Sequence, residues 1–124
     1  MASSPNKTVA VIDDHRYLRE SLKDLLEAAG YECELYESAE TFLSEKGYSL
    51  ADCILADVRM PGMSGLELQS KLNADHCPIP TIFITAHGEE KMRLQAMRGG
   101  AVKFLVKPFD DEALLEAVRA ALKS

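Results

Sequence analysis

The sequence predicts an α/β protein: a single domain built on a doubly wound, five-stranded parallel sheet with the strand order 2-1-3-4-5. Short apolar runs rich in β-branched residues alternate with segments of helical spacing, which is typical of βαβ units. The first, third and fourth runs are apolar on both faces, as buried parallel strands should be. The second and fifth runs carry polar side chains, so we expect them at the edges. With right-handed crossovers, this strand order needs only one reversal of the direction in which successive strands are added to the sheet, and that reversal lies beside the first strand.

The strands are predicted from runs that are too short and too β-branched for buried helices. The second run alternates, with Cys33 and Leu35 on one side and Glu32 and Glu34 on the other, which indicates an edge strand. The fifth run begins at Lys103, which also favours an edge. The predicted strands are Thr8–Ile12, Glu32–Tyr36, Cys53–Ala56, Thr81–Ile84 and Phe104–Val106.

Helices are predicted where apolar residues recur every three or four positions. One apolar stripe occupies residues 18–29 and stops at Gly30. A second occupies residues 114–122, and Asp110 or Asp111 is its predicted N-cap. The three shorter helices are predicted over Ala39–Leu43, where Ser38 is the cap, over Gly65–Leu72, and over Glu89–Arg98.

Composition and charge exclude several classes of protein. With 124 residues, 47% of them hydrophobic, the chain can build one core of its own. Its formal net charge of −6 argues against nucleic-acid binding, which depends on neutralising phosphates with Lys and Arg. Three cysteines without a C-x-x-C pair predict reduced thiols. No apolar run could span a membrane and no secretory signal opens the chain, so we expect a cytoplasmic protein. Residues 1–6 are expected to be a disordered tail and residues 7–124 the domain.

Polar residues stand at the ends of four predicted strands. Asp13 and Asp14 follow the first strand, Asp57 the third, Thr85 the fourth and Lys107 the fifth. Because ligands bind at the carboxyl ends of strands in open α/β sheets, these side chains should meet in one cleft. Each pair of carboxylates ~5 Å apart costs on the order of 3 kcal/mol at an effective dielectric of about 20. A hard divalent cation relieves that cost, and an all-oxygen site suits Mg²⁺. The set favours phosphoryl transfer to a carboxylate.

These motifs resemble those of bacterial response-regulator receiver domains, which have a flavodoxin-like (CheY-like) fold. The resemblance covers residues 7–122. Among receiver domains, the segments Arg19-Glu-Ser-Leu and Ala101-Val-Lys-Phe are most similar to the corresponding segments of the nitrogen-fixation and nitrate-type regulators. The motifs that carry it are Val11-Ile-Asp-Asp14, Ile54-Leu-Ala-Asp57-Val-Arg-Met-Pro-Gly-Met-Ser-Gly65, Phe83-Ile-Thr85-Ala86 and Phe104-Leu-Val-Lys107-Pro-Phe109.

The resemblance implies a role for each site residue. Asp57 would accept a phosphoryl group from a histidine of a sensor histidine kinase. Asp14 and Asp57 would bind Mg²⁺ directly, together with the backbone carbonyl of Arg59. Asp13 would act mostly through a bound water, and Lys107 would hold a phosphoryl oxygen.

The resemblance also implies a conformational switch. The Thr85 hydroxyl would turn onto the phosphoryl group, and Phe104 would move into the space that it leaves. The Lys107–Pro108 peptide would be cis. New charge-assisted bonds to a phosphoryl group can bias a loop and helix between two arrangements. We therefore expect the helix over residues 89–98 and the last strand to form the output face, for homodimer contact or an effector.

The resemblance leaves the architecture of the whole protein open. Related regulators carry a C-terminal helix-turn-helix DNA-binding domain, whereas this chain stops at Ser124, after the last predicted helix. We expect either the receiver part of a transcription regulator, with the output domain absent from this chain, or a single-domain receiver that acts by protein contact.

The sequence argues against two other interpretations. A hydrolase of the haloacid dehalogenase type also uses an aspartate nucleophile and Mg²⁺, but it needs a second acid where this chain has Arg59. A flavodoxin-like cofactor binder needs a glycine-rich loop after the first strand, which is missing. The residues His15, His76 and His87 show no metal-ligand spacing, and a solvated surface position is favoured for all three.

Overall fold

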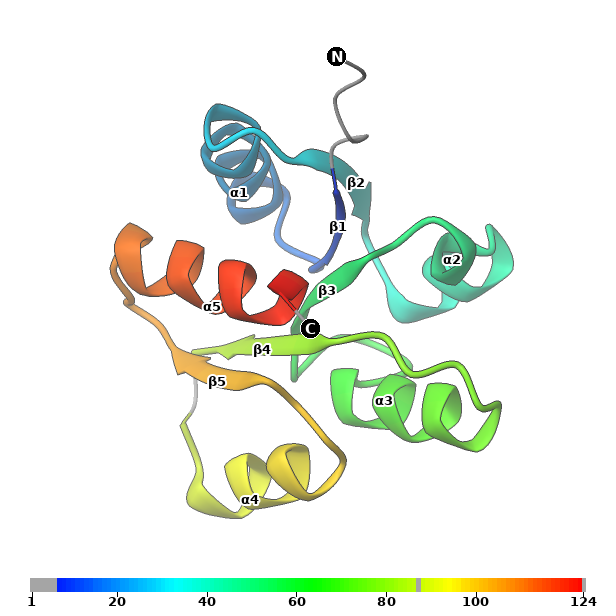
Figure 1. The fold of residues 1–124 in the computed structure, drawn as a ribbon. Helices are drawn as coiled ribbons and strands as arrows, with labels where there is room; N and C mark the ends of the chain where they lie inside the picture. The colour runs from blue at the N-terminus through cyan, green and yellow to red at the C-terminus, as the bar shows by residue number, and fades with distance from the viewer. Residues whose placement is uncertain (1–6, 87, 124) are drawn as a thin grey trace.

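A five-stranded parallel sheet lies at the centre of the protein, with helices on both of its faces (Figure 1). The structure is a computed structural model that describes residues 7–86 and 88–123, so the tail expected over residues 1–6 lies outside the described residues. The strand order is β2-β1-β3-β4-β5, as predicted. The strands are β1 (Thr8–Ile12), β2 (Glu32–Tyr36), β3 (Cys53–Asp57), β4 (Thr81–Thr85) and β5 (Lys103–Val106).

The five predicted helices are all present, with ends that differ by a few residues. One additional turn of 3-10 helix at Gly47–Ser49 was not predicted. Gly47 packs so closely beneath Phe42 that a Cβ there would lie 2.5 Å from the ring, so tertiary packing rather than local pattern favours this turn. The helices are α1 (Arg16–Ala28), α2 (Ala39–Ser44), α3 (Gly65–Ala74), α4 (Glu90–Arg98) and α5 (Asp111–Lys123).

Each face of the sheet is covered by its own set of helices. Helices α1 and α5 cover one face, and α2, α3 and α4 cover the other (Figure 1). Successive strand residues point to opposite faces, so Val9 and Val11 pack with α1 and α5, whereas Ala10 and Ile12 pack on the other side. Strands β3 and β4 are buried along their whole length, and the exposed positions fall on β2 and β5, which confirms these two as edges.

The carboxyl ends of the strands and the helix starts beside them define the site. Asp57 and Thr85 are the last residues of β3 and β4, one residue further than the predicted strands reached. The Ser38 hydroxyl accepts the N–H of Thr41 at 3.0 Å, as expected of the cap of α2. Ser64 and Glu67 form a reciprocal capping box that starts α3 directly after the loop from β3.

Candidate functional site

Three carboxylates and one imidazole come together where β1 and β3 end. Asp13 directly follows β1, and Asp57 ends β3, which pairs with β1 in parallel register. Asp14 and His15 follow Asp13 in the loop that leads into α1. One candidate ligand atom from each of these four residues lies within 4.8 Å of the others. The structure therefore brings together the three acids that the sequence placed at one edge of the sheet.

Asp13 has no exposed surface, and its surroundings leave one carboxylate oxygen without a hydrogen bond. Its Oδ1 accepts the backbone N–H of His15 at 2.8 Å and lies 3.2 Å from Nδ1 of that ring. Among the described residues its Oδ2 has no hydrogen-bond partner, and Nζ of Lys107 stands 3.7 Å away. The Asp13 carbonyl accepts Nη1 of Arg19 at 2.7 Å. Because an unpartnered buried carboxylate oxygen is costly, this donor set fits a further cation.

The Asp57 side chain is almost enclosed as well. Its Oδ1 accepts the backbone N–H of Arg59 at 3.1 Å, and its Oδ2 lies 3.5 Å from Nζ of Lys107. Burial raises the pKa of Asp57 above its ordinary value, and the Asp13 carboxylate acts in the same direction. The Arg59 N–H and the Lys107 ammonium oppose this shift without cancelling it. The charge on Asp57 is therefore incompletely compensated by the protein, and positive charge added here is favourable.

Lys107 reaches the acids from the far side of β4. It directly follows β5, and its backbone N–H donates to the Thr85 carbonyl at 2.7 Å. Its side chain is 22% exposed and contacts both Asp13 and Asp57 with its ammonium group. The peptide bond between Lys107 and Pro108 is cis. The four predicted charged residues thus meet at one place, from three different strands.

Thr85 and Phe104 lie on one face of the sheet. Thr85 is buried at the end of β4, two residues after Phe83, which pairs with Phe104 of β5. Because side chains two residues apart share a face, Thr85 and Phe104 both project toward the side where α4 packs. Phe104 is partly buried against the cluster that includes Ala96 of α4. The structure thus places the hydroxyl and the ring on the same face, on adjacent strands.

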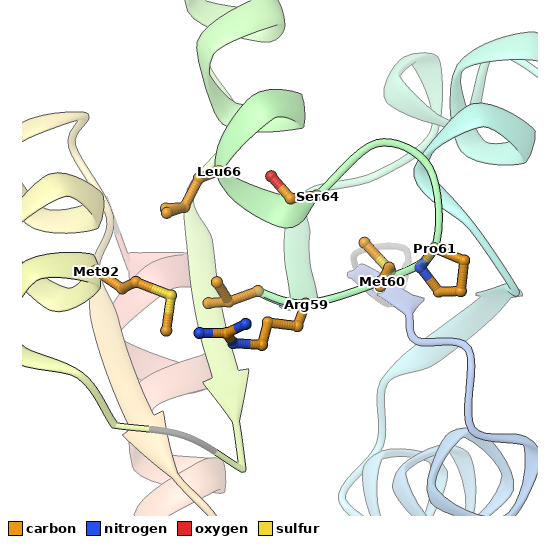
Figure 2. Close-up of a pocket in the computed structure, with 7 residues that line it drawn as sticks. Arg59, Met60, Pro61, Ser64, Leu66 and Met92 are labelled. Atoms are coloured by element: carbon orange, nitrogen blue, oxygen red, sulfur yellow. The ribbon is translucent and has the colours of Figure 1, made fainter.

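Arg59 lines a surface pocket between the β3–α3 loop and α4. Figure 2 shows its side chain extending from the loop toward Met92 of α4. Nη2 of Arg59 forms an ion pair with Oε1 of Glu89, just before α4, so two loops beside Asp57 are joined. Both side chains of this pair are 57% exposed. The residues that line the pocket are Val58, Arg59, Met60, Pro61, Ser64, Leu66 and Met92.

Three contributions to the site were not predicted from the sequence. Arg19, in the first turns of α1, holds the Asp13 carbonyl; the only available signal was a base six residues after an acid. Glu89 pairs with Arg59 across two loops, where no periodic pattern could indicate it. His15 is 67% exposed, in keeping with a solvated position, but its Nδ1 lies 3.2 and 3.4 Å from oxygens of Asp13 and Asp14. The solvated position expected of His15 is confirmed, and its ring also adjoins the acidic cluster.

His76 is not part of this cluster. His76 is exposed beyond the end of α3, and His87 lies outside the described residues. Within residues 7–86 and 88–123, none of the helices combines the length and the apolar character that a membrane crossing requires.

Comparison with known proteins connects this arrangement to one family. The profile of the family described as "Response regulator receiver domain" matches residues 9–119. The chain is 43% identical over 115 residues to the response regulator protein TodT of Pseudomonas putida strain F1, covering 93% of this chain and 51% of TodT. It is 49% identical over 115 residues to the transcriptional regulatory protein FixJ of Azorhizobium caulinodans, covering 92% of this chain and 54% of FixJ. The chain thus spans about half the length of these relatives. The crystal structure of FixJ-N superposes with a TM-score of 0.87 at 37% identity, covering 97% of this chain and 96% of that one.

Proposed function

The chain belongs to the family of response regulator receiver domains, and from this premise we propose that it is switched by a phosphoryl group on Asp57. One observation carries the proposal. The Lys107 ammonium lies 3.5 Å from Asp57 Oδ2, and the same carboxylate shares a cluster with Asp13 and Asp14. A buried carboxylate with a cation on one side and two acids on the other is suited to receive a phosphoryl group together with a metal ion.

The phosphoryl donor is a histidine of a sensor histidine kinase. A carboxylate oxygen of Asp57 forms a bond to phosphorus while the phosphorus–nitrogen bond to the donor imidazole breaks, and the imidazole keeps the electron pair. This transfer needs positioning and charge neutralisation more than a protein base. The Arg59 N–H bond to Oδ1 orients the carboxylate, which leaves Oδ2 on the Lys107 side as the attacking oxygen.

The metal ion that fits the site is Mg²⁺. Asp14 and Asp57 would hold it directly through their carboxylates, together with the Arg59 carbonyl, and Asp13 would act mostly through a bound water. Support comes from the unpartnered Oδ2 of Asp13 and from the oxygen-rich donor set. Magnesium, when bound, neutralises charge on the phosphoryl oxygens. The chain's own residues align the acceptor and supply the second cation, Lys107.

Phosphorylation changes the face formed by α4 and β5. The Thr85 hydroxyl turns to bind a phosphoryl oxygen, and Phe104 moves into the vacated space on the same side of the sheet. Support comes from α4 itself, which has one fully buried residue, Ala96, and exposes Leu94 and Met97. A helix held by so few buried side chains moves at low cost.

Residues 7–124 form the receiver domain. In the whole protein, the α4–β5 face of this domain controls a phosphorylation-dependent homodimer and a DNA-binding domain that follows it in the chain. The chain's coverage of about half of FixJ and TodT supports that arrangement. An alternative is a single-domain receiver, working in the cytoplasm by protein contact alone.

The test is to incubate the chain with Mg²⁺ and acetyl phosphate and to follow its mass. We expect one alkali-labile phosphoryl group, absent from Asp57→Asn and reduced in Asp14→Asn. Asp75→Asn is the control, because Asp75 is an exposed acid at the other end of α3. Steady turnover of phosphate esters without a trapped phosphoryl group would indicate a hydrolase and overturn the proposal.

A further inference from the structure

We propose that His15 makes the acidic cluster a selective site for first-row transition cations that accept nitrogen ligands, such as Ni²⁺ and Co²⁺, in addition to Mg²⁺. The inference rests on the proposed function in one respect: the acidic cluster of Asp13, Asp14 and Asp57 takes up a divalent cation. It adds a further ligand, Nδ1 of His15, and with it a preference among cations.

The imidazole already stands at the separation that ligands of one ion have. Nδ1 lies 3.2 Å from Oδ1 of Asp13 and 3.4 Å from Oδ1 of Asp14. Adjacent ligands of an octahedral ion with bonds of about 2.1 Å are about 3.0 Å apart. The separations of Nδ1 from these two oxygens therefore exceed that value by only a few tenths of an ångström. The fourth ligand atom, from Asp57, completes a group within 4.8 Å.

A second observation points independently to a bound cation. Asp13 is completely buried, and its Oδ2 has no hydrogen-bond partner among the described residues. The Lys107 ammonium is 3.7 Å from this oxygen and 3.5 Å from Oδ2 of Asp57, so Asp13 Oδ2 faces the space between the two carboxylates. An ammonium at that distance does not satisfy the buried oxygen, whereas a cation in the cluster does.

The loop between β1 and α1 holds His15 in place and leaves its ring accessible to a cation from solvent. The His15 backbone N–H donates to Oδ1 of Asp13 at 2.8 Å, which ties the residue to the acid it would share a cation with. The ring is 67% exposed, so a hydrated cation can reach Nδ1 from solvent. The contact between the ring and the acids comes from adjacent positions in the chain and requires no rearrangement of the strands.

The selectivity follows from the chemistry of the donors. Mg²⁺ takes oxygen ligands and keeps several of its waters, so an imidazole adds little to its binding. Imidazole suits Ni²⁺ and the neighbouring transition cations, which also bind N and O donors more tightly along the series from Mn²⁺ to Cu²⁺. His15 therefore strengthens the binding of Ni²⁺ and Co²⁺ selectively.

The test compares Ni²⁺, Co²⁺ and Mg²⁺ binding to the whole chain by calorimetric titration. Loss of even an outer partner of a metal ligand lowers affinity about 10–100-fold. We therefore expect His15→Gln to weaken Ni²⁺ and Co²⁺ binding by about tenfold or more and to leave Mg²⁺ binding nearly unchanged. His76→Gln, which alters an exposed histidine away from the cluster, should change neither. The visible absorption of bound Co²⁺ should also change in His15→Gln, because a nitrogen ligand is lost.

The outcomes separate this inference from the proposed function. Unchanged Ni²⁺ affinity in His15→Gln, with Mg²⁺ still bound, would overturn the role of His15 alone. If the wild type fails to bind Mg²⁺ and the Ni²⁺ affinity is insensitive to Asp57→Asn, the acidic cluster is not the metal site and both proposals fail. Ni²⁺ binding that depends on His15 but not on Asp14 or Asp57 would place the ion outside the cluster and overturn the inference.

Discussion

Nζ of Lys107 lies 3.5 Å from Oδ2 of Asp57, although the strands that carry these residues do not adjoin. Strand β4 runs between them, and Lys107 reaches over its end while its own N–H bonds the Thr85 carbonyl at 2.7 Å. Lys107 is therefore linked to two strands at once, to β3 through its ammonium group and to β4 through its backbone N–H. A phosphoryl group on Asp57 would meet this cation and the last residue of β4 in the same place.

Replacing Lys107 by Ala should separate phosphorylation from its structural consequence. The acids remain, so Mg²⁺ binding persists, but the bond that connects the phosphoryl group to the β5 side is lost. Coupling free energies between two sites are typically about 1–3 kcal/mol. We expect Lys107→Ala to remove most of the coupling between the phosphoryl group on Asp57 and the face formed by α4 and β5. Backbone amide shifts of α4 and β5, measured by NMR with and without beryllofluoride and Mg²⁺, report the effect.

The control for this variant is Lys103→Ala, which removes an exposed cation from the start of β5 and should leave the shift changes intact. A Lys107→Ala protein that responds to beryllofluoride as the wild type does would show that Lys107 plays no part in transmitting the signal.

Replacing Asp57 by Asn should stabilise the metal-free protein at neutral pH. Burial raises the pKa of Asp57, so the folded protein holds this proton to a higher pH than the unfolded chain does. The unfolding free energy of the wild type therefore falls as pH rises from the ordinary aspartate pKa to the raised one, and the loss is complete above the raised value. Asn cannot ionise, so its variant escapes this loss.

Urea unfolding in EDTA between about pH 4 and pH 7 measures this difference. The advantage of Asp57→Asn over the wild type should be smallest at the acid end and grow toward neutrality. Asp75→Asn, at an exposed position, should show no such trend. A constant difference across the range would mean that Asp57 ionises as easily in the folded protein as in the unfolded chain.

The fold was predictable because its signals are periodic and local. Alternation identified β2 as an edge, and apolar runs identified β1, β3 and β4 as central. The charged site followed from the same signals, since Asp57 and Lys107 stand at strand ends and a parallel sheet brings such ends together. The Arg59–Glu89 pair joins two loops, and its geometry depends on how α4 packs, which no sequence pattern records. The ring position of His15 depends likewise on a loop conformation rather than on a period.

Replacing Gly65 by Ala should damage both stability and phosphorylation. A Cβ at this first residue of α3 would lie 2.4 Å from the backbone oxygen of Asp57, which cannot move without displacing the end of β3. Ala ordinarily favours a helix over Gly by up to about 1 kcal/mol. Here the overpacking should reverse that gain and cost about 1–3 kcal/mol. Urea unfolding and the rate of phosphorylation by acetyl phosphate measure the two effects.

Gly99→Ala is the matched comparison for Gly65→Ala. A Cβ at Gly99 would also meet a close neighbour, at 2.5 Å, but that neighbour is the end of the Gln69 side chain rather than backbone, and moving it costs at most its hydrogen bond to the Ala96 carbonyl. The Gly99 variant should therefore lose less stability and keep a normal phosphorylation rate. Equal losses in the two variants would show that the Asp57 carbonyl yields as readily as a side chain.

Replacing Glu89 by Gln should shorten the lifetime of the phosphoryl group on Asp57. The Arg59–Glu89 ion pair joins the loop after β3 to the loop before α4, and both loops adjoin the acceptor. The pair is largely exposed, so its loss should lower stability by less than about 1 kcal/mol. Its effect on hydrolysis should be larger than its effect on stability, because loops that are no longer tied admit water to the acyl phosphate. The decay of the mass of the phosphorylated protein measures the lifetime.

Glu90→Gln is the control, since Glu90 pairs with Arg93 within α4. Equal lifetimes in the two variants would show that the ion pair does not restrict water at Asp57.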